Sequence, residues 1–227
     1  MTTAFPHPYY PLGVELPGYL ANESSVLSLV GRFAVCWVTV LGIAFLIINR
    51  VRPSASRSDR LAFLWFCLTA SIHLFFEAYF VLNHAHVAGA RDLFGQLWKE
   101  YSLADSRCLT SDTFLVCMEF VTAFCWGPLG LLVAYCIAVQ HPVRHALQII
   151  ISLGQIYGDV LYYATSMFDL YNNGVHFCRP ERYYFWFYYF FMNFIWIVIP
   201  SYYLVQSVTE IANAFRKVDE SRAARKS

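Results

Sequence analysis

Five long apolar runs divide the 227-residue chain. Each is about as long as the ~20 apolar residues that cross a bilayer as one helix. The runs are Leu27 to Ile48, Leu61 to Leu82, Phe114 to Ala138, Ala146 to Thr165 and Tyr184 to Val205. This pattern predicts an all-α, polytopic membrane protein built as a bundle of five transmembrane helices.

The fourth run is the most polar of the five. It carries Gln148, Ser152, Gln155 and Asp159 at helical spacing. Lipid cannot hydrogen-bond such side chains, so we expect this polar stripe to face the interior of the bundle.

Composition agrees with a membrane protein. Hydrophobic residues make up 58% of the chain and charged residues 14%, whereas soluble domains have about 25% charged residues. The net charge of +1 excludes the clustered basic surface that nucleic-acid binding requires. We predict a non-cytosolic segment at residues 1–26, a five-helix membrane domain at 27–206 and a basic cytosolic tail at 207–227.

Basic residues also predict the orientation. The first loop, the third loop and the tail hold ten Lys and Arg residues, and the opposite side holds five. By the positive-inside rule the first group is cytosolic, which places the N-terminus across the membrane. Cys108 and Cys178 fall in two non-cytosolic loops, where a disulfide bridge and two free thiols are both open alternatives.

Ionisable and polar side chains lie inside four of the apolar runs. An ionisable group there costs at least ~2.5 kcal/mol on insertion scales and marks a candidate functional site. The pairs at helical spacing are His73 with Glu77, Glu119 with Thr122, Gln155 with Asp159, and Asn193 with Trp196.

The depth of these pairs favours one shared site. At ~1.5 Å per residue they lie about 12 to 24 Å from the cytosolic edge of the membrane. Two carboxyl groups and one imidazole, from His73, Glu77 and Glu119, suit general acid–base chemistry in a low-dielectric pocket. Simple interhelical hydrogen bonds are an equally good explanation for three members of the set. These three are Gln155, Thr122 and Asp159.

The sequence lacks the residues that other membrane-enzyme chemistries would need. A diiron site needs many histidines, and His73 is the only one at depth, so we expect no metal. An intramembrane aspartyl protease needs two facing aspartates, and only Asp159 lies deep in a run. Without a phosphate loop or a dinucleotide fingerprint, the sequence predicts proton transfer with no cofactor.

Several longer motifs carry a family resemblance. They are Ile72-His73-Leu74 with Glu77, Gln96-Leu97-Trp98-Lys99-Glu100-Tyr101, Cys117-Met118-Glu119 with Thr122, Gly154-Gln155-Ile156-Tyr157-Gly158-Asp159-Val160-Leu161-Tyr162, and Phe191-Met192-Asn193 with Trp196. In order and spacing the chain resembles the emopamil-binding protein family, the sterol Δ8-Δ7 isomerases of the EXPERA group in the endoplasmic reticulum.

The resemblance implies a 3-beta-hydroxysteroid Δ8-Δ7 isomerase of the endoplasmic reticulum membrane. Such an enzyme protonates a sterol at C9 and deprotonates it at C7 through a carbocation. Residues tied to activity in the family match His73, Glu77, Glu119, Thr122, Asn193 and Trp196. We also expect substrate contacts from Tyr101, Asp159, Tyr157 and Trp186. The implied partners are a sterol substrate, cationic amphiphilic drugs and the lipid bilayer.

Two other functions are weaker alternatives. A non-catalytic sterol- or drug-binding protein of the same fold would not need the complete His73, Glu77 and Glu119 set. A small transporter would show polar residues along a full pore or an internal repeat. The sequence leaves open the preferred sterol and whether the protein acts as a homodimer.

Overall fold

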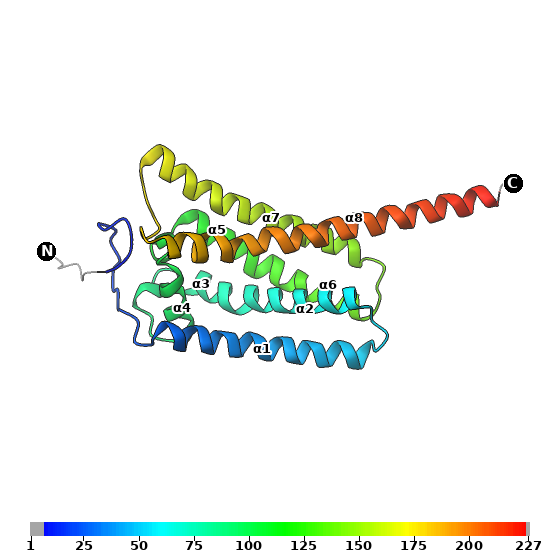
Figure 1. The fold of residues 1–227 in the computed structure, drawn as a ribbon, viewed down its shortest axis with the longest axis horizontal. Helices are drawn as coiled ribbons and strands as arrows, with labels where there is room; N and C mark the ends of the chain where they lie inside the picture. The colour runs from blue at the N-terminus through cyan, green and yellow to red at the C-terminus, as the bar shows by residue number, and fades with distance from the viewer. Residues whose placement is uncertain (1–6, 226–227) are drawn as a thin grey trace.

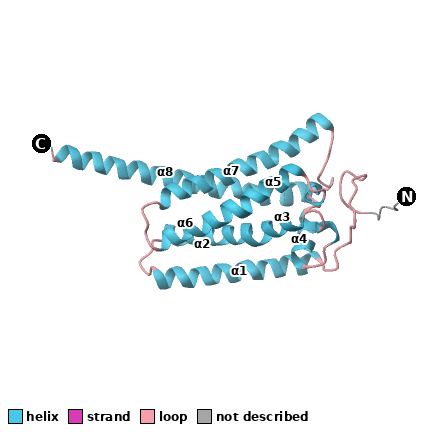
Figure 2. Cartoon of the chain, turned by 180° about the vertical axis from the view of Figure 1, so that it is seen from behind, coloured by secondary structure: helices cyan, strands magenta, loops and turns pink. Residues whose placement is uncertain are grey.

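The computed structural model describes residues 7–225, and this range contains helices and loops but no β-strand. Long helices lie side by side in a bundle, from which the C-terminal helix projects (Figures 1 and 2). The α-helices are α1 (Val26–Val51), α2 (Arg57–Ser71), α3 (Ala78–Asn83), α4 (Leu93–Tyr101), α5 (Thr113–Val121), α6 (Gly127–Ala138), α7 (Arg144–Phe168) and α8 (Met192–Ala224).

Segments of π-helix interrupt or extend the long helices. They are Ile72–Glu77 between α2 and α3, Thr122–Trp126 between α5 and α6, Asp169–Asn173 after α7, and Tyr184–Phe191 before α8. Short 3₁₀ turns lie at Val87–Gly89 and Ser106–Leu109. Because π-helical turns are rare and frequently lie at functional sites, the first two segments draw attention to the middle of the bundle.

Four continuous helices are long and apolar enough to cross a membrane. They span Val26–Val51, Arg57–Asn83, Thr113–Ala138 and Tyr184–Ala224, and they contain the first, second, third and fifth predicted runs. Helix α7 contains the fourth run but falls outside this group, so a count of five spans is not confirmed. Its stripe from Gln148 to Asp159 is buried, which confirms that these polar side chains face the interior.

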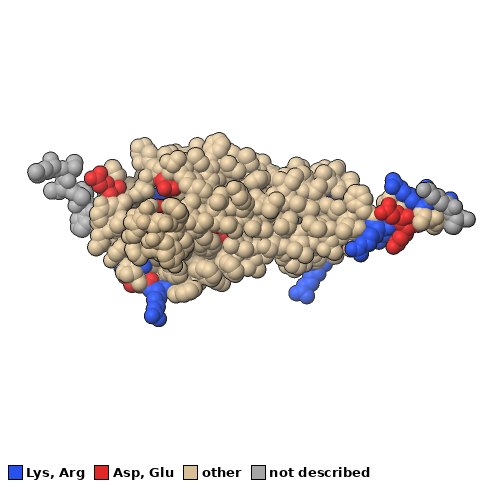
Figure 3. Space-filling model, turned by 90° about the horizontal axis from the view of Figure 1, so that it is seen from above, with Lys and Arg blue, Asp and Glu red and all other residues tan. Residues whose placement is uncertain are grey.

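The packing leaves an apolar outer surface. Helix α7 lies along α8, and α2 packs against both α1 and α6. On α1, Leu29 and Ile48 are buried, whereas Val35, Val38 and Leu46 are exposed. Charged side chains gather near the two ends of the bundle and on the projecting part of α8, and a broad, nearly uncharged band lies between them (Figure 3). This is the surface expected of a bundle surrounded by lipid.

The N-terminal segment covers one end of the bundle, which we call the N-terminal end. The Tyr9 hydroxyl donates to the Lys99 carbonyl at 3.1 Å, and Lys99 Nζ donates to the Leu20 carbonyl at 2.7 Å. A Cβ on Gly89 would lie 2.7 Å from the Gly18 carbonyl oxygen, so glycine is required for this close approach. Residues 7–25 are therefore an integral part of the fold.

At the opposite end, ion pairs of Asp59 on α2 join this helix to the loop after α1 and to α7. Asp59 pairs with Arg52 at 2.9 Å and also with Arg144 at the start of α7. Helix α8 continues beyond this end to Ala224. Most of the predicted tail at 207–227 therefore continues the last helix.

Candidate active site

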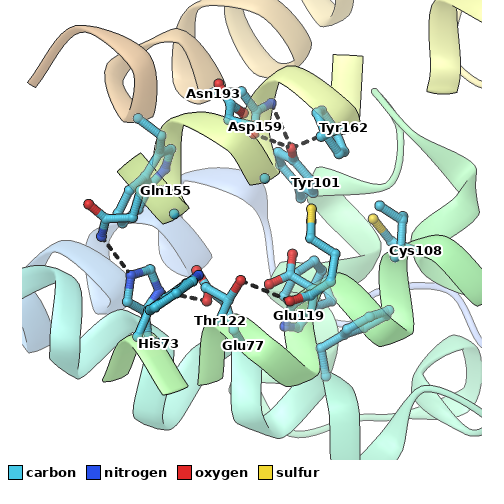
Figure 4. A pocket seen from close by; sticks show the side chains of 18 residues that line it. His73, Glu77, Tyr101, Cys108, Glu119, Thr122, Gln155, Asp159, Tyr162 and Asn193 are labelled. Carbon is cyan, nitrogen blue, oxygen red and sulfur yellow. Dashed lines mark hydrogen bonds and ion pairs between the residues drawn. The ribbon is translucent and has the colours of Figure 1, made fainter. Parts of the chain in front are cut away.

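The N-terminal half of the bundle holds a pocket with a cavity volume of about 90 Å³. This volume is smaller than the roughly 300–1,000 Å³ typical of small-molecule sites, so the lining side chains must move apart to admit a larger ligand. Its lining comes from both central π-helical segments and from α4, α5, α7 and α8. Eight of the ten predicted site residues belong to this lining, and Figure 4 labels all of them except Trp196. They are His73, Glu77, Tyr101, Glu119, Thr122, Asp159, Asn193 and Trp196.

A buried hydrogen-bond chain crosses one side of the pocket. His73 Nδ1 lies 2.7 Å from Glu77 Oε2, and Gln155 Nε2 lies 3.0 Å from His73 Nε2. With the Gln155 amide donating to Nε2, the imidazole proton resides on Nδ1 and is donated to Glu77. The predicted meeting of His73 and Glu77 on one helix face is confirmed, and α7 holds the ring from its other side.

Glu119 extends this chain from α5. Its half-buried carboxyl group lies beside that of Glu77 in the same pocket. The pocket therefore brings two carboxyl groups and an imidazole together, the groups that general acid–base chemistry requires.

Thr122 and Trp196 lie next to these groups. The Thr122 hydroxyl donates to the Met118 carbonyl at 2.9 Å, so in this structure it bonds to its own helix. The Trp196 ring lies 5.2 Å from the His73 ring, centroid to centroid, and 5.6 Å from that of Trp65. An indole in this place gives the pocket an electron-rich wall next to the acid–base groups.

A second polar group faces the pocket from α4, α7 and α8. The Tyr101 hydroxyl lies 3.0 Å from Asn193 Oδ1 and 3.1 Å from the Tyr162 hydroxyl. Burial raises the pKa of Tyr101 well above its usual value, so its hydroxyl remains protonated and able to donate. Asn193 Nδ2 also donates to the Tyr189 carbonyl at 2.6 Å, which fixes the orientation of the amide.

A buried ion pair supports this group from the N-terminal end. Arg107 Nη2 lies 2.6 Å from Asp105 Oδ2, and both side chains are almost completely enclosed. The same guanidinium donates to Thr165 Oγ1 at 2.9 Å and lies over the Tyr162 ring, 5.1 Å from its centroid. Arg107 thus fixes the α7 segment that presents Tyr162 to the pocket.

Asp159 occupies the wall one turn beyond Gln155. Its side chain is buried, yet no other described residue hydrogen-bonds or ion-pairs with its carboxyl group. In Figure 4 it lies near Asn193 and Tyr101, across the pocket from His73 and Glu77.

The other two predicted substrate contacts lie elsewhere. Tyr157 is 65% exposed on the outer face of α7, and Trp186 lines a separate pocket beside Met167 and Phe185. Tyr157 is two residues from Gln155, which places it on a different side of the helix. A direct contact between either residue and the substrate stays a prediction.

Sequence reasoning gave too little weight to Gln155 and did not select Tyr162 as a site residue. The signal for Tyr162 was present, because Gln155, Asp159 and Tyr162 follow the i, i+4, i+7 pattern of one helix face. For the two loop cysteines, the structure has Cys108 and Cys178 as free thiols. Within residues 7–225, no group of three or more His, Cys, Asp or Glu side chains is arranged to bind a metal ion.

Comparison with known proteins identifies the family of this chain. The sequence pattern of EXPERA, the expanded EBP superfamily, matches residues 93–207. The chain belongs to the EXPERA family. This match includes six of the eight predicted site residues in the pocket, and the helix bearing His73 and Glu77 precedes it.

Similar proteins from three animals match nearly the whole chain. One from Cavia porcellus is 38% identical over 215 residues, covering 94% of this chain and 92% of that protein. Proteins from Rattus norvegicus and Mus musculus are each 39% identical, over 215 and 217 residues, with the same two shares. All three are named 3-beta-hydroxysteroid-Delta(8),Delta(7)-isomerase.

Proposed function

We propose that this EXPERA protein is a sterol Δ8-Δ7 isomerase. The observation that carries the proposal is the hydrogen-bonded chain from Gln155 through His73 to Glu77, with the carboxyl group of Glu119 beside it in the same pocket. Moving a ring double bond requires an acid to give one proton and a base to take another. The names of the relatives supply the substrate class, a 3-beta-hydroxysteroid.

The reaction begins with proton transfer to carbon. The carboxyl pair of Glu77 and Glu119 gives its shared proton to C9 of the Δ8 double bond, and the electron pair of that bond forms the new C9–H bond. A tertiary cation is left at C8. Because the two carboxyl groups share the proton, the donor is the pair and not one assigned residue.

The cation is stabilised inside the pocket and then loses a proton. The Trp196 ring faces the same space as His73, and a cation–π interaction contributes about 2 kcal/mol when desolvated. The His73–Glu77 unit takes a proton from C7, and the C7–H electrons form the C7=C8 bond. Proton exchange between the neighbouring carboxyl groups of Glu77 and Glu119 returns the proton to its starting place, so the enzyme is unchanged.

The other lining residues bind and orient. Asn193 and Tyr101 form the polar wall opposite the acid–base groups, while Thr122 supports the helix that carries Glu119. The carboxyl groups and the indole also suit a ligand with a buried ammonium group, which resembles the cation at C8. We therefore propose that cationic amphiphilic drugs bind in the same pocket.

The membrane arrangement follows from the helices and the charges. We propose that α7 is a fifth span, because its polar stripe is buried among the other helices and need not face lipid. Residues 1–26 then lie on the luminal side of the endoplasmic reticulum membrane, 27–206 form the membrane domain, and 207–227 are cytosolic, as the basic residues of the loops and tail require.

Expression in cells that lack their own sterol isomerase tests the function. With the chain present, mass spectrometry should show that Δ8 sterols decrease and Δ7 sterols appear. The His73→Ala variant, produced at an equal level, should restore less than about 1% of this conversion, since general acid–base groups contribute at least 100-fold. Persistent Δ8 sterols with the unmodified protein would reject the proposal.

A further inference from the structure

The carboxyl group of Asp159 faces the pocket without a partner among residues 7–225 of the protein. Its side chain is 8% exposed and lines the cavity, and its Oδ2 atom has no hydrogen-bond partner. Arg107, a buried cation that contacts Tyr162 on the same helix, is already paired with Asp105. Buried polar groups in native proteins almost always have partners. An orphaned carboxyl group facing a ligand pocket therefore points to a hydrogen-bond donor on the ligand.

The position of Asp159 relative to the acid–base groups indicates which donor. Asp159 follows Gln155 by four residues on α7, and Gln155 contacts His73. The two α7 side chains are thus about one helical turn apart, or ~5.4 Å along the axis. In a 3-hydroxysterol, the oxygen on C3 and the C8–C9 bond are separated by a comparable distance. That distance spans ring A and the first part of ring B.

Resting on the proposed isomerase function, we infer that Asp159 accepts a hydrogen bond from the 3-hydroxyl of the sterol and thereby makes the pocket selective for 3-hydroxysterols. With the hydroxyl at Asp159, ring B lies beside His73, Glu77 and Glu119. Apart from its hydroxyl, such a sterol has few or no donors, and the remaining pocket wall is largely aromatic and aliphatic. Asp159 is a substrate-orienting residue that takes no part in the proton transfers.

The neighbouring groups leave this role to Asp159. Asn193 and Tyr162 both bond to the Tyr101 hydroxyl, and Glu77 bonds to His73 with Glu119 beside it in the pocket. The Gln155 Oε1 atom is also without a partner, but it lies on the amide that holds His73. Among the lining carboxyl groups, Asp159 alone is free to accept a donor at the far side of the pocket.

A pair of substrates separates this role from a structural one. We would measure the kcat and KM of purified enzyme for a Δ8 sterol with its 3-hydroxyl and for the matching 3-deoxy sterol. The Asp159→Leu variant should lose about tenfold in kcat/KM with the hydroxylated sterol, because it removes the hydrogen-bond acceptor of the 3-hydroxyl. Most of this loss should appear in KM. The 3-deoxy sterol should be turned over within about twofold by the variant and the unmodified enzyme.

Two further variants complete the test. Asp159→Asn keeps an acceptor oxygen and should give an intermediate loss with the hydroxylated sterol only. If Asp159→Leu does not fold, the comparison of the two sterols with Asp159→Asn tests the role of Asp159 instead. Asp169→Leu removes a carboxyl group at the end of the same helix, where Asp169 accepts from Asn173, and should leave the ratio of the two substrates unchanged.

Each result has a distinct meaning. Equal losses with both sterols, or no loss with the hydroxylated sterol, would overturn the role of Asp159. If the unmodified enzyme converts neither sterol, the proposed isomerase function itself fails.

Discussion

Replacing Gln155 by leucine would test how the pocket controls the His73 tautomer. The Gln155 amide donates to His73 Nε2 at 3.0 Å, and both side chains are buried. Leucine fills a similar volume but cannot donate. The Nε2 atom would then be an unsatisfied acceptor, and the proton would no longer be confined to Nδ1, from which it faces Glu77 at 2.7 Å.

The size of the effect follows from that lost partner. Leaving a buried acceptor unsatisfied costs about 1–3 kcal/mol, which corresponds to about a 5- to 150-fold decrease in kcat at 1.4 kcal/mol per tenfold. The loss should fall on kcat and leave KM almost unchanged, because Gln155 acts through the imidazole. Isomerisation of a Δ8 sterol by purified protein, followed by chromatography of the products, measures both constants.

Gln148 offers a matched control on the same helix. It is also buried, but it donates to the Tyr203 carbonyl at 3.2 Å and to Gln206 Oε1 at 3.0 Å. Gln148→Leu should lower thermal stability and leave kcat per folded molecule unchanged. The account of the tautomer would be refuted if both variants had the same kcat, or if Gln155→Leu raised KM at constant kcat.

Three further predictions concern the surroundings of the pocket. Asp105→Asn should lower the free energy of unfolding by about 3–5 kcal/mol, because it leaves the buried Arg107 without a counter-charge; Glu181→Gln, at an exposed pair, should leave the melting temperature unchanged. Burial raises the pKa of the Cys178 thiol to about 12 and that of Cys108 well above its usual value. Since only the thiolate reacts, maleimide at pH 8 should label both only after denaturation, and labelling that requires a reductant would instead reveal a disulfide. A glycosylation tag between Phe168 and Arg182 should be modified while a C-terminal tag is not, and the reverse result would invert the topology.

The length of the apolar runs was sufficient to locate the long helices. All five predicted runs lie inside continuous helices, because their length and composition leave helix as the form that satisfies the backbone in lipid. The contact of His73 with Glu77 also followed from local spacing. The fourth run shows the limit of this reasoning. Its polar stripe keeps α7 out of the group of helices that are apolar enough to cross a membrane, so only its packing supports a fifth span.

Features that depend on tertiary contacts were not predictable. The π-helical segments Ile72–Glu77 and Thr122–Trp126 carry no spacing signal that distinguishes them from α-helix. The hydrogen bond between Tyr101 and Tyr162 joins residues 61 positions apart. Trp186 was a candidate because it is aromatic, but within Tyr184–Phe191 every residue is aromatic, and only the packing decides which ring faces a cavity.

The most direct test of the central claim compares purified Glu119→Gln with the unmodified protein. Glutamine keeps the shape of the side chain and removes the transferable proton, so sterol binding should persist. If the carboxyl pair delivers the proton to C9, single-turnover conversion of a bound Δ8 sterol should slow at least ~100-fold. Conversion within tenfold of the unmodified protein would contradict the account.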